Sequence, residues 1–435
     1  MINSILGAIG HFILGLLPLV GTALLFYVAW TFWVHYIQQN FISGITWVIL
    51  EVVPPRDVLR SPKAMELFFT NALYHKSSKG GMEEYWQGAV WFWYSLEIVS
   101  IDGQVHFYVR CPSRLKSLIE TQMYAQYPQA QVKEVEDYTL AVPEIKKGSD
   151  WNLWGAEFKL DRPEAFPIKT YVEFGLDDDP KEEYKIDPLS PVIEFFSSIG
   201  KGEQFWLQIV IRADHEKKFH THGTWFGHHD WVTESQKDME KISEPYTKVG
   251  QRKDTGGFSH EVRAPDWLKP VLEAMTLKTT KLGFETGIRL CYVAKREIFS
   301  QNRRRDSRLI FRQYAMPNSN QFVRFNGTQM DAYPWATALM SEKKVDTLRN
   351  RMLHEYRERA FFHVPMRHHI FSHQPYFLPW PISPLFFPNF SHHDTFILNT
   401  EELATIWHFP GQILKVPGLE RVESKEASPP TNLPT

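Results

Sequence analysis

The chain has 435 residues, a formal net charge of −2, a hydrophobic fraction of 43% and a charged fraction of 23%. These values are typical of a globular protein that can bury a core. They exclude a broadly basic protein that attracts nucleic acid or anionic lipid over its whole surface, so any such contact would be local. Only two cysteines occur, Cys111 and Cys291, and no disulfide framework is expected.

The first fifty residues contain no Lys, Arg, Asp or Glu. Phe12 to Ile37 is almost continuously apolar, and as a helix it would be roughly 39 Å long, enough to cross a ~30 Å hydrocarbon core. The segment lacks the basic start and the cleavage site of a signal peptide. Aromatic residues that could form an interfacial belt gather in its C-terminal half: Tyr27, Trp30, Trp33 and Tyr36. We therefore expect residues 1–40 to be a membrane anchor, with a transmembrane helix over about 12–37.

Basic residues follow this apolar segment but do not precede it. Arg56, Arg60 and Lys63 lie close to its C-terminal end. Because basic residues are retained on the cytoplasmic side, this pattern predicts a single-pass protein of the inner (cytoplasmic) membrane with its soluble body in the cytoplasm. The low cysteine content agrees with that compartment.

The next segment, 41–150, has the pattern of a first ferredoxin-like unit with the element order βαββαβ. A β-branched run over 45–53 predicts the first strand, and Ser61-Pro62 marks the start of a helix. Strands over 89–101 and 105–111 are joined by Asp102-Gly103, a strong hairpin signal. A helix that begins at Pro112-Ser113 and a strand over 130–135 complete the unit.

A second ferredoxin-like unit is expected over 151–335. Its predicted elements are a strand over 168–175, a helix over 188–199, strands over 204–213 and 287–299, a helix over 305–314 and a strand over 321–326. An insertion at about 214–285 interrupts the unit, with helices expected over 233–246 and 264–278. Such a long insertion is usually functional or faces a partner. The predicted fold class is therefore α+β, with a transmembrane helix followed by two tandem ferredoxin-like units.

The C-terminal part divides into a segment over 336–415 and a polar tail or linker over 416–435. The first of these begins with a strongly charged helix over 341–361. A stretch over 370–393 follows that has five prolines and no charged side chain, which excludes a spanning helix. It either docks on the body or contacts a partner or lipid.

Signatures of catalysis and nucleotide binding are absent from the sequence. The pattern GxxxxGK[ST] does not occur, and Gly200-Lys201-Gly202 lacks the earlier glycine, so we interpret it as a turn. GxGxxG, GxSxG and CxxC are also absent. We therefore predict no catalytic residue, no resident cofactor and no bound metal.

Histidines nevertheless cluster in two places, and imidazole with carboxylate suits a transition metal. The first group lies over 215–230 and ends at Asp230; the second lies over 363–394. The first group comprises His215, His220, His222, His228 and His229, and the second His363, His368, His369, His373, His392 and His393. The spacings match no metal site. A metal-dependent hydrolase that uses the 215–230 loop is the alternative function.

The densest basic patch lies where the helix over 305–314 is expected to begin. Arg304, Arg308 and Arg312 would share one face of that helix. Such a stripe can neutralise phosphates or can be a solvated face. Arg303, Arg305 and Asp306 lie beside it. These arginines are the candidate nucleic-acid contacts.

Three segments resemble a known family: LEVVPPRDVLRSPKAMELFF (50–69), a stretch over 168–213 that contains DPLSPVIEFFSSIGKGEQFWLQIVIRA, and FILNTEELATIWHFPG (396–411) with its trailing PGLERVESKEASPPTNLP. The chain is similar to the membrane-anchored N-terminal module of conjugative DNA-transfer ATPases of the type IV secretion class, in the form found in candidate-phyla bacteria. In that family a RecA-type motor domain follows this module, and no nucleotide-binding residue has a counterpart in this sequence.

The resemblance implies a non-enzymatic scaffold that assembles with, or docks, a separate translocation ATPase of the type IV secretion class. The expected partners are the lipid bilayer, that motor ATPase and further copies of this chain, with nucleic acid contacted indirectly if at all. A DNA-contacting collar formed by the arginines would instead bind in a salt-dependent manner.

Overall fold

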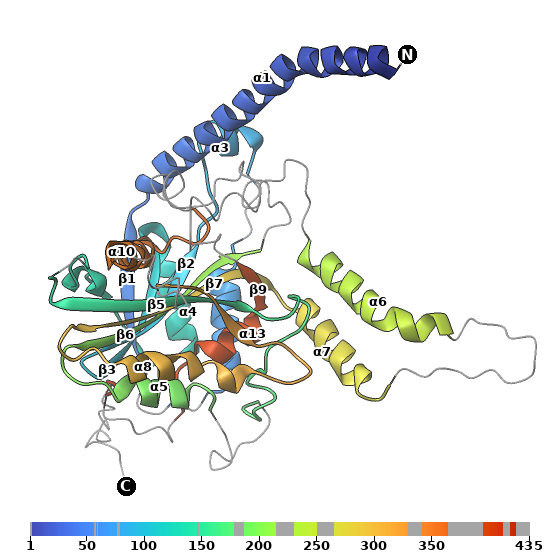
Figure 1. Cartoon of the computed structure of the whole chain (residues 1–435). Coiled ribbons are helices and arrows are strands. Elements are labelled where there is room, and N and C mark those ends of the chain that lie inside the picture. Colours follow the sequence, from blue (N-terminus) through green and yellow to red (C-terminus); the bar gives the residue numbers. More distant parts are fainter. Residues whose placement is uncertain are drawn as a thin grey trace, which may run out of the picture.

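The computed structural model describes residues 2–55, 58, 60–75, 79–145, 148–177, 187–214, 230–249, 265–328, 342–363, 395–411 and 418–422 (Figure 1). The helices of five or more residues are α1 (Ile2–Ser43), α2 (Lys63–Phe68), continued by a π-helical turn (Phe69–Leu73), α3 (Gly81–Tyr85), α4 (Lys116–Gln126), α5 (Ser190–Ser197), α6 (Trp231–Val249), α7 (Leu268–Thr280), α8 (Gln301–Asp306), α10 (Glu342–Glu358) and α13 (Thr400–Ile406). The strands are β1 (Trp47–Val53), β2 (Tyr94–Ile101), β3 (Gln104–Pro112), β4 (Gln131–Val135), β5 (Trp151–Leu160), β6 (Glu203–Ala213), β7 (Gly283–Lys295), β8 (Phe322–Gly327) and β9 (Phe396–Asn399).

All nine strands belong to one antiparallel sheet, so the fold is α+β. Eight of them follow the order β4-β1-β3-β2-β6-β7-β5-β8, and β9 pairs with the start of β7. The two halves of the chain meet where β2 pairs with β6, from Tyr94 opposite Ile211 to Ile101 opposite Gln204. The halves are therefore continuous through backbone hydrogen bonds and share one sheet.

The strands of the two halves follow the same order from the outer edge of the sheet to the junction. In each half this order is fourth, first, third and second strand. The first strand of each half lies between the third and the fourth, and the second strand lies at the junction. In the second half the first strand is β5, and the strand expected over 168–175 is absent. The backbone N–H groups of Ile168 and Tyr171 donate instead to Glu402 and Thr405 of α13. Residues 171–177 then form turns.

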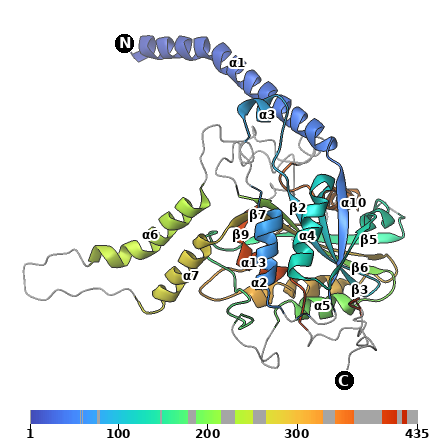
Figure 2. The same cartoon turned by 180° about the vertical axis from the view of Figure 1, so that it is seen from behind.

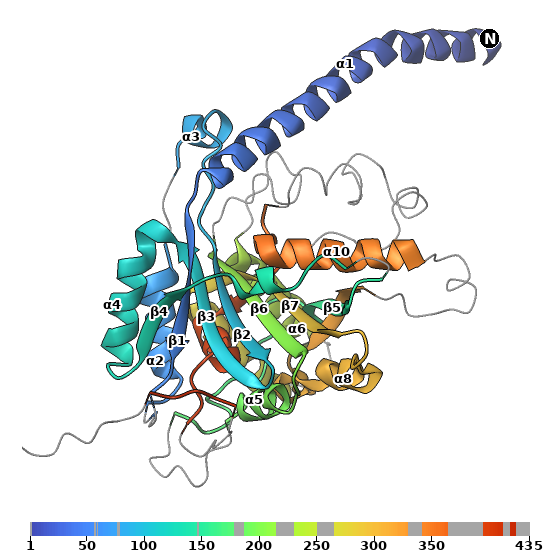
Figure 3. The same cartoon turned by 90° about the vertical axis from the view of Figure 1, so that its left-hand side faces the viewer.

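Alternation of side chains along the strands separates two faces of the sheet. One face carries the main apolar core, which includes Leu96, Ile209 and Leu290 and is covered by α2, α4, α5 and α13. The other face carries a smaller core with Trp206 and lies beneath α10 (Figure 3). Charged residues are buried on this second face, as described below.

The expected membrane anchor is wrong and the predicted fold class is corrected accordingly. Among the residues that the structure describes, no helix is long and apolar enough to cross a membrane. The C-terminal part of α1 packs instead against the protein. Val34 and Ile37 are buried, Trp33 Nε1 donates to the backbone oxygen of Tyr85 at 3.2 Å, and the ring of Trp30 lies 5.9 Å from that of Tyr85.

The absence of a spanning helix among the described residues also corrects the expected single-pass location in the inner membrane, whereas the lipid partner stays a prediction. Two aromatic residues that we assigned to an interfacial belt, Trp30 and Trp33, contact α3. Gly88, with φ +68°, allows the close approach, because a Cβ atom there would lie 2.3 Å from the carbonyl oxygen of Ile37. The aromatic content of α1 is therefore partly explained by contacts within the chain.

The predicted insertion emerges from the end of β6 and returns at the start of β7. Its helices α6 and α7, which we call the arm, stand away from the sheet in two opposite views (Figures 1 and 2). The two helices contact each other where Thr276 Oγ1 lies 3.7 Å from Met239 Sδ. The corresponding connection in the first half is the two-residue turn Asp102-Gly103, at which both residues have positive φ.

Part of the expected polar tail is packed against the first half of the sheet. The backbone N–H of Val105 donates to the Gly418 oxygen at 2.6 Å, and Val422 forms a parallel bridge with Pro55. Residues 423–435 and the proline-rich stretch 370–393 lie outside the described residues.

Candidate functional site: a buried polar network beneath α10

A row of polar side chains crosses the middle of the sheet on the face beneath α10. Glu97 of β2 is opposite Gln208 of β6, Gln208 is opposite Arg289 of β7, and Arg289 is opposite Glu157 of β5. All four residues are buried. We call them the polar row, and strand register alone places them side by side.

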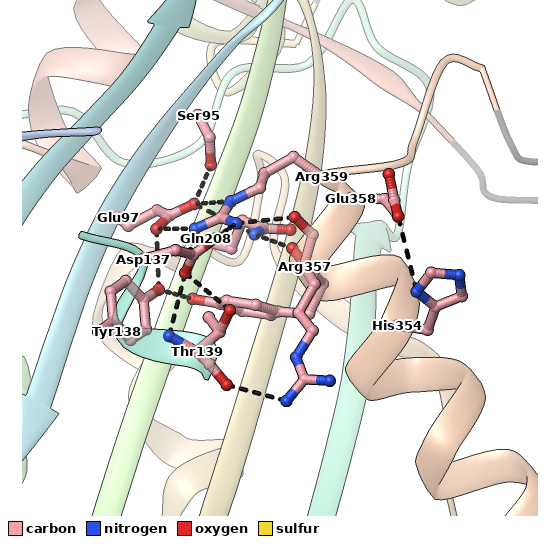
Figure 4. A network of polar contacts seen from close by, with 11 residues as sticks. Ser95, Glu97, Asp137, Tyr138, Thr139, Gln208, His354, Arg357, Glu358 and Arg359 are labelled. Carbon is pink, nitrogen blue, oxygen red and sulfur yellow. Dashed lines mark hydrogen bonds and ion pairs between the residues drawn. The ribbon is translucent and has the colours of Figure 1, made fainter. Parts of the chain in front are cut away.

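Glu97 accepts hydrogen bonds from four side chains (Figure 4). Arg359 makes a two-point contact, with Nε 2.9 Å from Oε1 and NH2 3.2 Å from Oε2. The Ser95 hydroxyl donates to Oε1 at 2.6 Å, and the Tyr138 hydroxyl donates to Oε2 at 2.8 Å. Gln208 Nε2 adds a longer bond of 3.2 Å. The carboxylate is therefore fully occupied as an acceptor.

The single hydroxyl proton of Tyr138 is used by Glu97, so the hydroxyl of Tyr356, 2.8 Å away, donates to Tyr138. Tyr356 lies in the last turn of α10. A chain of hydrogen bonds thus runs from the helix to the strand. Tyr356 is buried and Tyr138 is partly buried, and their removal from solvent raises the pKa of each well above its usual value.

Arg359 adopts the left-handed conformation, with φ +51°, immediately after α10. Its backbone N–H donates to the Tyr356 oxygen, and the N–H of Ala360 donates to the Glu355 oxygen. This is the Schellman pattern, in which glycine is the usual residue at the left-handed position. An arginine there tolerates the strain because its guanidinium binds Glu97 and also Asp137.

Arg289 binds the same helix end from the strand side. NH1 donates to the Glu355 oxygen at 3.1 Å, and NH2 donates to the Ala360 oxygen at 2.7 Å. Its Nε donates to Glu157 at 2.7 Å, and Asn326 donates to the other oxygen of Glu157. A cation at a helix C-terminus is favoured by the helix dipole. Arg289 of the polar row therefore caps the C-terminal end of α10 from the side of the sheet.

Charge is closely balanced inside the network. Burial raises the pKa of Glu97, but the charge of Arg359 and the hydrogen bonds from Arg359, Ser95 and Tyr138 outweigh it and hold that pKa below 4.5. The pKa of Asp137 is lowered in the same way, against its burial, chiefly by Arg359. Both carboxylates are therefore ionised at neutral pH.

Two glycines on the same face let the helix and the residues after it approach the strands. A Cβ on Gly155 would lie 2.6 Å from Met352 Cγ, and a Cβ on Gly287 would lie 2.3 Å from the ring of Phe361. The Phe361 ring also covers the guanidinium of Arg289 at 3.9 Å. Met352 and Phe361 therefore pack closely against the strands that carry the network.

This arrangement is suited to holding α10 in place. An ionised carboxylate that already accepts from several donors is a poor general base, because its lone pairs are in use. The hydroxyl groups of Ser95 and Tyr138 donate to that carboxylate, but its ion pair with Arg359 lowers its pKa and makes it a weak base for activating either hydroxyl. Within the described part of the chain we therefore interpret the network as a structural lock.

The predicted arginine stripe does not lie on one continuous helix. The chain forms α8 up to Asp306, then 3₁₀ turns over Ser307–Leu309 and Arg312–Tyr314. Arg304 and Arg312 consequently belong to different elements, and the side chain of Arg308 lies outside the described residues. Arg303, next to the stripe, donates to Ser198 and lies 3.5 Å from Glu203. Nucleic-acid contact at these arginines stays a prediction.

The histidine clusters and the alternative metal site fall mostly outside the described residues, because 215–229 and 364–394 are not included. Asp230 is described, and it accepts from the Val232 N–H and the Thr233 hydroxyl, as a residue at the start of α6 does. Searched over the residues that are described, His, Cys, Asp and Glu form no group able to hold a metal ion. Gly200-Lys201-Gly202 forms the predicted turn, between α5 and β6.

The polar row was missed by sequence reasoning. Each member is a polar residue inside an otherwise apolar strand, as in YSLEIVSI and GIRLCYVAK. That pattern could have marked the residues individually. Their side-by-side placement depends on register between strands from both halves, which the sequence does not specify. Arg359 was expected inside the charged helix over 341–361, whereas it lies past the end of α10 at Glu358.

Comparison with known proteins gives one family. The model of the family described as Domain of unknown function (DUF8128) matches residues 93–417, well over half of the chain. The matched region begins at β2 and contains the whole polar row, the arm and α10. No curated protein shows significant similarity to the chain. The chain belongs to the DUF8128 family.

Proposed function

We propose that this protein is a non-enzymatic scaffold whose arm docks a separate translocation ATPase of the type IV secretion class. The resemblance of segments 50–69, 168–213 and 396–434 to the module that precedes such motors supports the choice of partner. The arm supports the mode of action. Self-association of the chain and indirect contact with nucleic acid are further parts of this proposal.

The observation that carries the proposal is the arm's place in the fold. In the first half a two-residue turn connects the paired strands β2 and β3, whereas in the second half residues 214–282 separate β6 from β7 and include the helices α6 and α7. Folding does not require this excursion, since a short turn joins antiparallel strands. A long insertion that keeps the register of its flanking strands is typical of a functional element.

The base of the arm is fixed to the body by a buried ion pair. Lys278 in the last turn of α7 lies 3.0 Å from Oε2 of Glu402 in α13, and both side chains have no exposed surface. Lys278 Nζ also donates to the backbone oxygen of Ile397 at 3.2 Å. Glu402 accepts from the backbone N–H groups of Ile168 and Asn399. A free surface loop would not need this anchoring.

A second lysine extends the attachment to the first half of the chain. Lys281 lies 2.5 Å from Glu401 of α13 and 3.1 Å from Glu66 of α2. The Tyr171 hydroxyl donates to Glu66 at 2.5 Å. A force on the arm is therefore transmitted to helices from both halves. This is the mechanical property that a docking scaffold needs.

Exposed apolar side chains on α7 give the arm a surface on which a partner can bury area. Leu277 is 65% exposed, and Trp267, directly before the helix, is 54% exposed. Large apolar side chains exposed on a projecting element are common at interaction sites. Leu140, which is 71% exposed on the body, serves as a matched control.

The test uses the purified full chain and a purified ATPase of this class from the same organism, mixed and analysed by size-exclusion chromatography with light scattering. We expect a complex with the wild type and with Leu140→Arg. We expect Leu277→Arg to weaken it by roughly tenfold or more, because a charge would enter a desolvated interface.

A wild-type chain that forms no complex with the motor would contradict the proposal. So would equal affinity of Leu277→Arg and the wild type, which would remove the arm from the interface. ATP hydrolysis by the chain alone would contradict its non-enzymatic role.

A further inference from the structure

Arg110 of β3 is partly buried and forms no ion pair with a carboxylate of the described residues. It lies on the face of the polar row, opposite Ile49 on one side and Ser95 on the other. Its guanidinium is 4.2 Å from the centre of the Trp47 ring, and the buried NH1 has no hydrogen-bond partner among the described residues. Burial, followed by repulsion from Arg359, lowers the pKa of Arg110 to about 9.

Glu97, Asp137 and Glu358 lie close enough to Arg110 to raise its pKa, but none of them forms an ion pair with it in the described part of the chain. Glu97 and Asp137 both bind the guanidinium of Arg359. Glu51, the nearest carboxylate on β1, lies 2.6 Å from His106. A guanidinium N–H that is buried without an acceptor destabilises the folded state unless a ligand accepts its hydrogen bond.

A second unpaired donor lies beside the same aromatic ring. Trp93 is only 4% exposed, and its buried Nε1 has no acceptor among the described residues. The rings of Trp93 and Trp47 are 4.8 Å apart. A guanidinium N–H and an indole N–H are thus both left unsatisfied around Trp47. Unsatisfied buried donors are rare in native proteins, and an absent ligand is one physical explanation.

Positive charge continues on the far side of Trp93. The ring of His363 lies 5.6 Å from that of Trp93, and its buried Nε2 also has no partner among the described residues. Arg212 and Lys79 lie close enough to His363 to lower its pKa, after burial, which is the largest cause. The nearby carboxylate of Glu285 is bound by Arg212 at 2.5 Å.

We propose that Arg110 and Trp93 form a phosphate-binding site, in which the guanidinium and the indole N–H donate to phosphate oxygens beside Trp47. The planar guanidinium presents paired donors that match phosphate geometry. A phosphate group also offers several oxygens, which can accept from both donors at once. Arg110 retains some exposed surface, so a ligand can reach it from solvent. The phosphate is either free or part of a nucleotide.

Isothermal titration calorimetry of the full chain in chloride buffer tests this site, with inorganic phosphate and adenosine monophosphate as separate probes. We expect wild-type protein to bind phosphate. Arg110→Gln should weaken binding at least tenfold, and Trp93→Phe, which keeps the ring but removes the N–H, should weaken it several-fold. Tighter binding of the nucleotide than of inorganic phosphate would identify the nucleotide as the source.

The control is Arg162→Gln. Arg162 is also stacked on an aromatic ring, Phe166 at 5.6 Å, but lies beyond the end of β5. The Arg162→Gln variant should bind phosphate as the wild type does. Absence of phosphate binding by the wild type would overturn the proposal whatever the variants do. Equal weakening by Arg162→Gln, or acetate binding as tight as phosphate binding, would also overturn it.

Thermal unfolding gives a readout that does not depend on the binding heat. In phosphate-free buffer Arg110→Gln should unfold at the same temperature as the wild type or higher, because the substitution removes a desolvated guanidinium that has no ion-pair partner among the described residues. Phosphate should then raise the midpoint of the wild type more than that of the variant. A variant that is much less stable without phosphate would show that Arg110 has another partner within the protein and would contradict the site.

Discussion

Arg359 and Glu97 form a fully buried ion pair, 2.9 Å from Nε to Oε1, between residues that are 262 positions apart in the chain. Arg359 follows the end of α10 and Glu97 lies in the centre of β2. The pair therefore connects the C-terminal part of the chain to the first half of the sheet. Because both side chains are inaccessible to solvent, neither can lose its partner without a large desolvation cost.

Replacing Arg359 by methionine should lower the free energy of unfolding by about 3–5 kcal/mol, because the buried Glu97 and the partly exposed Asp137 would lose their shared cation. Urea unfolding followed by circular dichroism measures the change. The double variant Glu97→Gln with Arg359→Met should recover part of the loss, since one of the two unpaired carboxylates is removed. Additive losses would show that the two side chains do not interact energetically.

Acid should destabilise the wild type through the same carboxylates. The folded-state pKa of Glu97 lies below 4.5 and that of Asp137 below 3.8. Their stabilisation is therefore present above these values and is lost as the pH falls through the folded-state pKa values. The Arg359→Met variant lacks the cation that outweighs the effect of burial. The pKa of Glu97 should therefore rise above 4.5 in this variant. The stability difference between wild type and variant should shrink from pH 7 to pH 4, and a constant difference would contradict this account.

The two lysines at the base of the arm should differ in importance. Lys278→Met leaves Glu402 fully buried without its cation and should cost roughly 3 kcal/mol. Lys281→Met removes a pair in which the lysine side chain is 32% exposed and should cost only about 0–1 kcal/mol. Hydrogen exchange of α7 and α13 should accelerate in the first variant and stay close to wild type in the second. Equal effects would show that burial does not determine the strength of the attachment.

Gly287 should not tolerate even a methyl group. Gly287→Ala would force the Phe361 ring away from β7 and should destabilise the protein by about 1–3 kcal/mol. At Gly80 an added Cβ meets no atom within 4 Å, so Gly80→Ala is the matched control. The thermal midpoints of the two variants provide the comparison. A neutral Gly287→Ala would mean that residues after α10 are not held against the sheet.

Much of the local structure could be predicted from the sequence because it follows from local signals. The hairpin at Asp102-Gly103 and the helix that begins near Pro112-Ser113 are both present, since turn and capping residues act over a few positions. The segment 168–175 was predicted as a strand from its β-branched and aromatic residues. Tertiary hydrogen bonds from Ile168 and Tyr171 to α13 override that propensity.

Two larger features could not be predicted from local signals. The apolar character of α1 indicated lipid, yet Val34 and Ile37 are buried by the protein itself. Apolar patterning reports that a side chain is buried but does not identify what buries it. The polar row depends on β2 pairing with β6, a contact between the two halves. Nothing in the sequence of either strand specifies that partner.

The central claim is that the arm is the docking element for a translocation ATPase. Hydrogen–deuterium exchange of the full chain, with and without the purified motor, tests it most directly. We expect new protection in α6 and α7, at Trp231–Val249 and Leu268–Thr280, with β2 and β7 unchanged. Protection confined to the body, or no change in the presence of the motor, would contradict the account.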